Sequence, residues 1–187
     1  MTCRWTQAKM REVADEERAE LGLTWDQPLD PYRLAEAHGI PVYAIDELLD
    51  CEHAVRHFTT TRTSAWSAAL VPVGQRRLII ENTSHAPVRR RSSIAHELGH
   101  FLLEHPFDEV LLTEKGCRRF DPGREKQATF VSGELLVPWK GAIQAAFDDM
   151  TNAQVAQTYG VSEQFAQMRM SGARVAARNM RAKRGAR

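Results

Sequence analysis

The fold is organised around residues 92–104, whose sequence is SSIAHELGHFLLE. On a helix with about 3.6 residues per turn, the apolar side chains fall on one broad face, and His96 and His100 fall on the opposite face. Side chains four residues apart lie one above the other, with about 5–6 Å between Cβ atoms. Two imidazoles at this spacing can bind one metal ion. Glu97 lies beside them, where a carboxylate can contact a coordinated water without being a ligand.

A surface helix with two solvated histidines is the alternative interpretation of this stretch. Two features favour a zinc site instead. The apolar face is cleanly opposed to the histidine face, and the helix is expected to begin after a basic, turn-like run over residues 87–91. A third ligand would complete the protein part of a catalytic zinc site.

Length and composition suit one medium domain, or a domain with a small appendage. The chain has 187 residues and a formal net charge of +1, so bulk charge predicts no attraction to nucleic acid or membrane. Residues 1–13 contain no apolar segment typical of a signal peptide, and no apolar run approaches about 20 residues. The widely spaced Cys3, Cys51 and Cys117 favour reduced thiols. We therefore expect a cytoplasmic protein rather than a secreted or membrane-linked one.

Apolar periodicity and turn residues predict helices before a small sheet. The predicted helices cover residues 8–21 and 31–39, the second with Asp30 as N-cap and Pro31 at its first position. A short strand is expected over 40–45 and a β-hairpin over 65–71 and 77–81, followed by a loop over 82–91. This order predicts an α+β fold with a small antiparallel sheet and helices on one side. One edge of the hairpin would be free to pair with an extended peptide.

A further helix is predicted over residues 125–137 and ends before Pro138, after a loop over 107–123. Glu125 lies on a narrow stripe of mainly small side chains, including Ala128 and Ser132. Small side chains allow close approach to another helix, which would bring Glu125 towards the histidine face. Its alternative role is that of a solvated carboxylate favoured by the helix dipole.

Several other side chains after His100 are candidates for the third ligand. Residues 104 and 105 continue the predicted helix and lie too far along its axis to complete a tetrahedron. Cys117 would give a site with two histidines and one cysteine, although a free thiol is the commoner role. From spacing alone Glu125 and its solvated alternative stay equally open. The full set of candidates comprises Glu104, His105, Glu109, Glu114, Cys117, Asp121, Glu125 and Glu134.

Two motifs together resemble the ImmA/IrrE metallopeptidases. The first is SIAHELGH over residues 93–100, and the second begins with Glu125-x-x-Ala128 and ends with ELLVP over residues 134–138. The resemblance covers about residues 34–138 and implies a small zincin-like core. It further implies that His96, His100 and Glu125 hold Zn²⁺ and that Glu97 is the catalytic base. The sequence departs from the family pattern at 129–131 and at 137, which concerns packing of the second helix more than the metal.

The C-terminal part has the spacing of a helix-turn-helix. Helices are expected over 152–159 and 163–170, with Gly160 at the turn and Ser162 as the second N-cap. Arg169 is the strongest candidate for a phosphate or guanine contact, with Gln164 and Gln167 as weaker ones. The residues after Arg169 include several basic and no acidic side chains. Such a segment suits either phosphate contact or a solvated, disordered terminus. Its basic residues are Arg174, Arg178, Arg181, Lys183, Arg184 and Arg187.

These features predict a metallopeptidase domain over residues 1–142, a helix-turn-helix-like segment over 148–172 and a basic tail over 173–187. The resemblance implies a short form without the GAF-like sensor domain of longer members. It also implies cleavage of a helix-turn-helix (XRE-type) transcriptional repressor, which would derepress stress-response, prophage or mobile-element genes. The alternative is a DNA- or repressor-binding module with a structural or vestigial metal site. Candidates for a second oxyanion donor are His105, Tyr43 and His85.

Overall fold

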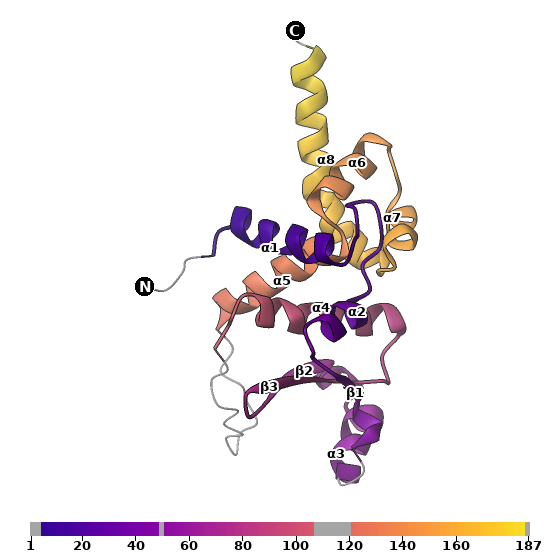
Figure 1. Cartoon of the computed structure of the whole chain (residues 1–187). Coiled ribbons are helices and arrows are strands. Elements are labelled where there is room, and N and C mark those ends of the chain that lie inside the picture. Colours follow the sequence, from indigo (N-terminus) through magenta and orange to yellow (C-terminus); the bar gives the residue numbers. More distant parts are fainter. Residues whose placement is uncertain (1–4, 49–50, 107–120, 186–187) are drawn as a thin grey trace.

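The computed structural model describes residues 5–48, 51–106 and 121–185 (Figure 1). A small sheet lies on one side of helix α4, and helices α5 and α1 lie on the other side. The last helix, α8, extends away from the sheet to the C-terminal end. The helical elements are α1 (Gln7–Glu20), α2 (Pro31–Ala37), η1 (Ile45–Glu47), α3 (Glu52–Arg56), η3 (His57–Thr61), η4 (Thr63–Ala65), α4 (Pro87–Leu102), α5 (Pro122–Leu136), α6 (Trp139–Phe147), α7 (Asn152–Tyr159) and α8 (Glu163–Gly185).

The sheet has three strands in the order β1-β3-β2, formed by Val42–Ala44, Arg76–Glu81 and Ala68–Val73 respectively. The hairpin of β2 and β3 is antiparallel, with Leu70 opposite Ile79. Strand β1 is parallel to β3, with Val42 opposite Ile79. The α+β class is therefore confirmed, but the sheet is mixed rather than wholly antiparallel. The long connection between β1 and β2 allows β1 to lie parallel to β3, on the side of β3 away from β2. The spacing of the hairpin strands in the sequence does not reveal this pairing.

Two predicted helix starts were wrong, and in each case the helix begins at a proline inside the predicted loop. Helix α4 begins at Pro87, so the basic run over 87–91 is its first turn and not a loop. Helix α5 begins at Pro122, with the Asp121 side chain accepting from Gly123 N at 2.8 Å. Proline is well suited to the first position of a helix, because an N–H group there would have no hydrogen-bond partner within the helix. Both helices around the candidate site are therefore longer than predicted at their N-terminal ends.

The interior is one continuous cluster of buried apolar side chains that extends from Met10 in α1 to Ala177 in α8. Helix α1 packs against α5 and buries Met10, Ala14 and Arg18. Helix α4 buries Ile94, Ala95 and Leu98, the apolar face predicted for it. The described part of the chain has no helix that is both long and apolar enough to cross a membrane.

Candidate metal centre

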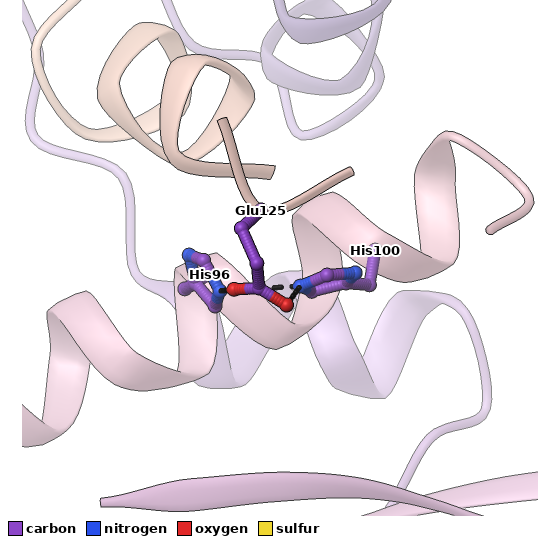
Figure 2. Close-up of side chains that lie close together, drawn as sticks. All are labelled: His96, His100 and Glu125. Carbon is purple, nitrogen blue, oxygen red and sulfur yellow. Dashed lines mark hydrogen bonds and ion pairs between the residues drawn. The ribbon is translucent and has the colours of Figure 1, made fainter. Parts of the chain in front are cut away.

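His96 and His100 lie one turn apart on α4, on the side that faces α5 (Figure 2). Their Nε2 atoms are 3.2 Å apart, and the ring centroids are separated by 4.9 Å. Both side chains are partly exposed, at 26% and 17% of their surface. The helical repeat alone brings these two nitrogens together, as the spacing in the sequence predicted.

Glu125 comes from the first turn of α5 and places its carboxylate between the two imidazoles (Figure 2). Its Oε2 is 3.1 Å from His96 Nε2, and its Oε1 is 3.4 Å from His100 Nε2. The alternative role of Glu125, a carboxylate that only interacts with its own helix dipole and solvent, does not match this position. Among the described residues these three form a group able to hold a metal ion.

The spacing of the three side chains fits a zinc ion. Ligand atoms placed about 2.0–2.1 Å from zinc at tetrahedral corners are about 3.3–3.4 Å apart. The shortest separations here are 3.1 Å from His96 Nε2 to Glu125 Oε2, 3.2 Å between the two Nε2 atoms and 3.4 Å from His100 Nε2 to Glu125 Oε1, so the two histidines contact different oxygens of one carboxylate. Two imidazole nitrogens and one carboxylate form a donor set found in catalytic zinc sites, which keep a fourth position for water or substrate. The three side chains therefore form a group whose donor atoms and spacing suit a metal ion.

Glu97 is buried on α4, next to the edge of the sheet. Only 7% of its surface is exposed, and its Oε2 accepts a hydrogen bond from Leu70 N in β2 at 2.9 Å. The bond to a backbone N–H of the sheet holds this carboxylate in place. The carboxylate therefore lies between α4 and strand β2.

His105 follows α4 and contacts the candidate site from one side. It is 7% exposed, and its ring lies 5.0 Å from that of His100. Burial lowers the pKa of His105 below the usual histidine value, which favours the neutral ring, and a hydrogen bond to Gln127 partly opposes this. The sequence identified His105 as a candidate ligand or oxyanion donor. The contribution of Gln127, which lies beside Glu125 on α5, was missed.

The other candidate ligands in the described part of the chain have different roles. Asp121 caps α5, and Glu104 is exposed at the end of α4 with a φ of 51°. Glu134 is 1% exposed and forms an ion pair with Arg169 at 2.9 Å. Cys117, Glu109 and Glu114 lie outside the described residues. Of the remaining oxyanion candidates, Tyr43 is on β1, at the sheet edge opposite β2, and His85 Nε2 lies 3.1 Å from Trp66 O.

The helix-turn-helix-like segment forms as predicted at its turn. Gly160 has a φ of 64°, and Ser162 Oγ accepts from Phe165 N at 3.1 Å. The second helix, however, continues to Gly185, so residues 173–185 are helical rather than a disordered tail. A helical continuation is compatible with this run because it contains no proline and is rich in alanine and arginine.

Arg169 is not available on the surface of the second helix. Its side chain is 10% exposed, and its Nε donates to Val137 O at 3.0 Å in addition to the ion pair with Glu134. Because Arg169 is buried, the prediction that it is the strongest candidate for a nucleic-acid contact was wrong. Of the later basic residues, Arg174 donates to Asn152 Oδ1 at 2.8 Å and Arg181 donates to Phe147 O at 2.6 Å. The division into three segments stays a prediction.

A comparison with protein families finds a match for this chain. The family is described as Peptidase_M78, IrrE N-terminal-like domain, and its model matches residues 35–171. The match covers well over half of the chain and contains α4, α5, the predicted site residues and α7. No curated protein matches the chain.

Proposed function

The chain belongs to the IrrE N-terminal-like (Peptidase_M78) family of peptidases, and from this premise we propose that it is a zinc-dependent endopeptidase. The observation that carries the proposal is the position of Glu125. A carboxylate from a separate helix contacts both histidines, with Oε2 3.1 Å from His96 Nε2 and Oε1 3.4 Å from His100 Nε2, which completes the two-histidine, one-carboxylate donor set of catalytic zinc sites. His96, His100 and Glu125 are the proposed ligands.

Zinc bound at this position would lower the pKa of a coordinated water towards about 7 and polarise the carbonyl group of the peptide. Glu97 is the proposed catalytic base. It accepts a proton from the water that attacks the carbonyl carbon, and it passes this proton to the amine nitrogen when the C–N bond breaks. The hydrogen bond from Leu70 N holds the carboxylate in one orientation throughout, so it needs no reorganisation to act.

The outer edge of β2 is the proposed binding site for an extended substrate segment. Ile79 N donates to Pro41 O at 2.9 Å, so Ile79 directs its backbone groups towards β1. Its partner Leu70 must then direct its own N–H and C=O away from β3, as the bond to Glu97 also requires. Within the described residues β2 pairs only with β3, so its outer carbonyls can accept from a peptide that adds as a further strand.

The proposed substrate is a helix-turn-helix transcriptional repressor, and its cleavage would derepress stress-response, prophage or mobile-element genes. The support for this finer proposal is the resemblance of both sequence motifs to ImmA/IrrE peptidases. A cytoplasmic location is proposed with it, because a repressor is encountered there. The buried Arg169 favours the peptidase over the alternative of a DNA-binding module, since the second helix of the turn motif then presents no arginine in its first two turns.

The test uses Glu97→Gln, with Glu104→Gln as the control. Both substitutions neutralise one carboxylate on or next to α4, but Glu104 is exposed and lies outside the predicted site. Purified proteins are loaded with zinc, exchanged into metal-free buffer and mixed with a repressor encoded beside them. We expect Glu97→Gln to retain zinc and leave the repressor intact on a denaturing gel, while Glu104→Gln cleaves as the parent does. Equal cleavage by Glu97→Gln and the parent would end the proposal.

A further inference from the structure

The end of α4 brings His105 back onto His100. Glu104 N donates to Phe101 O at 2.9 Å, and His105 N donates to His100 O at 3.0 Å. Together with the left-handed φ of 51° at Glu104, these two bonds form a Schellman motif. This motif places the residue after the left-handed position against the residue three positions inside the helix end. Here these two residues are His105 and His100, so helix termination itself sets their contact.

A chain of side-chain contacts runs from His100 into α5. His100 directs Nε2 towards Glu125 and Nδ1 towards His105, whose Nδ1 lies 3.0 Å away. The other nitrogen of His105, Nε2, lies 2.9 Å from Gln127 Oε1. The chain therefore starts at a proposed metal ligand and ends two residues after another one, Glu125, on the same helix.

The contact of His105 Nε2 with Gln127 Oε1 favours one arrangement of the protons along this chain of side chains. An amide oxygen only accepts hydrogen bonds, so His105 Nε2 carries the hydrogen that points at Gln127. In a neutral ring, Nδ1 of His105 then has a lone pair and accepts from His100 Nδ1–H. His100 consequently has its lone pair on Nε2, the nitrogen that faces Glu125 and His96. Metal-binding histidines are commonly oriented in this way through their second nitrogen.

We propose that His105 and Gln127 are positioning residues that hold His100 in the tautomer and orientation needed to bind the metal. This inference rests on the proposed function, because it takes His100 as a ligand. His105 acts through His100 and is not itself a ligand. Its 7% exposure means that water does not readily replace it as the acceptor for His100 Nδ1–H.

The experiment measures zinc affinity of the full chain by competition with a chromophoric chelator. Gln127→Leu removes the acceptor at nearly constant size, and His105→Phe keeps the ring shape but removes both nitrogens. Gln127→Glu restores an acceptor. Thr129→Ala is the control, an exposed neutral position on the same helix. We expect the dissociation constant for zinc to rise about 10–100-fold in Gln127→Leu and His105→Phe. Gln127→Glu should bind at least as tightly as the parent, and Thr129→Ala should match it.

The visible spectrum of the Co²⁺-loaded proteins gives a second readout. A change in the orientation of His100 alters the d–d bands, whereas a loss of packing alone lowers thermal stability of the metal-free protein and leaves these bands in place. Parent-like affinity and bands in Gln127→Leu would overturn the inference while leaving the metal site intact. Equal weakening in Gln127→Leu and Thr129→Ala would also overturn it, as a general effect on α5. A parent that binds no zinc would overturn the proposed site and this inference with it.

Discussion

Gly99 of α4 lies directly against the backbone of Ala128 in α5. A Cβ atom added to Gly99 would lie 2.8 Å from Ala128 O and 3.1 Å from Ala128 Cα. Gly99 directly precedes His100, and Ala128 is three residues after Glu125, so this close contact of the two helices is next to the candidate site. The absence of a side chain at Gly99 permits the approach that brings Glu125 to the histidine pair.

Gly99→Ala should therefore separate α4 from α5. Overpacking of this kind costs about 1–3 kcal/mol, against which the higher helix propensity of alanine returns up to about 1 kcal/mol. We expect a net loss of stability and weaker zinc binding, measured by chemical denaturation and chelator competition. Gly172→Ala in α8 is the matched control, because its nearest atoms are on Trp139 at 3.7 and 3.9 Å. That variant should gain stability, and a parent-like Gly99→Ala would contradict the role of the contact.

Glu125→Ala should lose its zinc. Two histidines alone leave the ion with one ligand fewer than catalytic zinc sites normally have. Metal analysis after buffer exchange should give close to one zinc per parent chain and much less for the variant. Glu163→Ala, which removes an exposed carboxylate at the start of α8, serves as the control. Equal zinc in parent and Glu125→Ala would move the third ligand elsewhere, with Cys117 the next residue to test.

Arg169→Ala should destabilise the fold without an effect specific to nucleic acid. Glu134 is 1% exposed, and besides Arg169 it accepts from Trp139 N at 2.8 Å and from Arg11 Nη2 at 3.3 Å. Breaking a buried ion pair costs about 3–5 kcal/mol, and the remaining partners should reduce this to about 2–4 kcal/mol. Urea denaturation measures the change. Arg178→Ala, at an exposed position on α8, should stay within about 0.5 kcal/mol of the parent.

The ionisation of Tyr32 should make the stability of the protein fall in alkaline solution. Burial, followed by the hydrogen bond that Tyr32 donates to Glu81 at 2.8 Å, raises the pKa of Tyr32 to about 12. Between pH 10 and 12 the unfolded chain loses the phenolic proton while the folded chain keeps it. The unfolded state then binds fewer protons, so the free energy of unfolding falls as the pH rises.

Tyr32→Phe removes this titration. Its stability should be lower than that of the parent at pH 8 because the hydrogen bond to Glu81 is lost, but it should fall less steeply between pH 10 and 12. Denaturation midpoints measured at several pH values give both slopes. Parallel slopes for Tyr32→Phe and the parent would show that Tyr32 does not cause the alkaline loss.

The sequence alone determined the features that depend on neighbouring residues in the chain. Helical geometry places His96 and His100 on one side of α4 and Glu97 beside them, whatever the rest of the fold does. The cap at Asp30 and the turn at Gly160 are also local, and both formed where they were predicted. The two motifs were sufficient to indicate the family, because they sample two elements of the same site.

Tertiary structure decided every feature that depends on contact between distant segments. The spacing did not single out Glu125 among the candidate ligands, and the close approach of α4 and α5 at Gly99 and Ala128 brings it beside the histidines, while Cys117 lies outside the described residues. The parallel pairing of β1 and the burial of Arg169 against Glu134 were likewise absent from local patterns. The sequence around an arginine on a helix is the same whether the arginine faces solvent or a buried carboxylate. Periodicity indicates only which face of the helix the arginine occupies, and the carboxylate lies on another element.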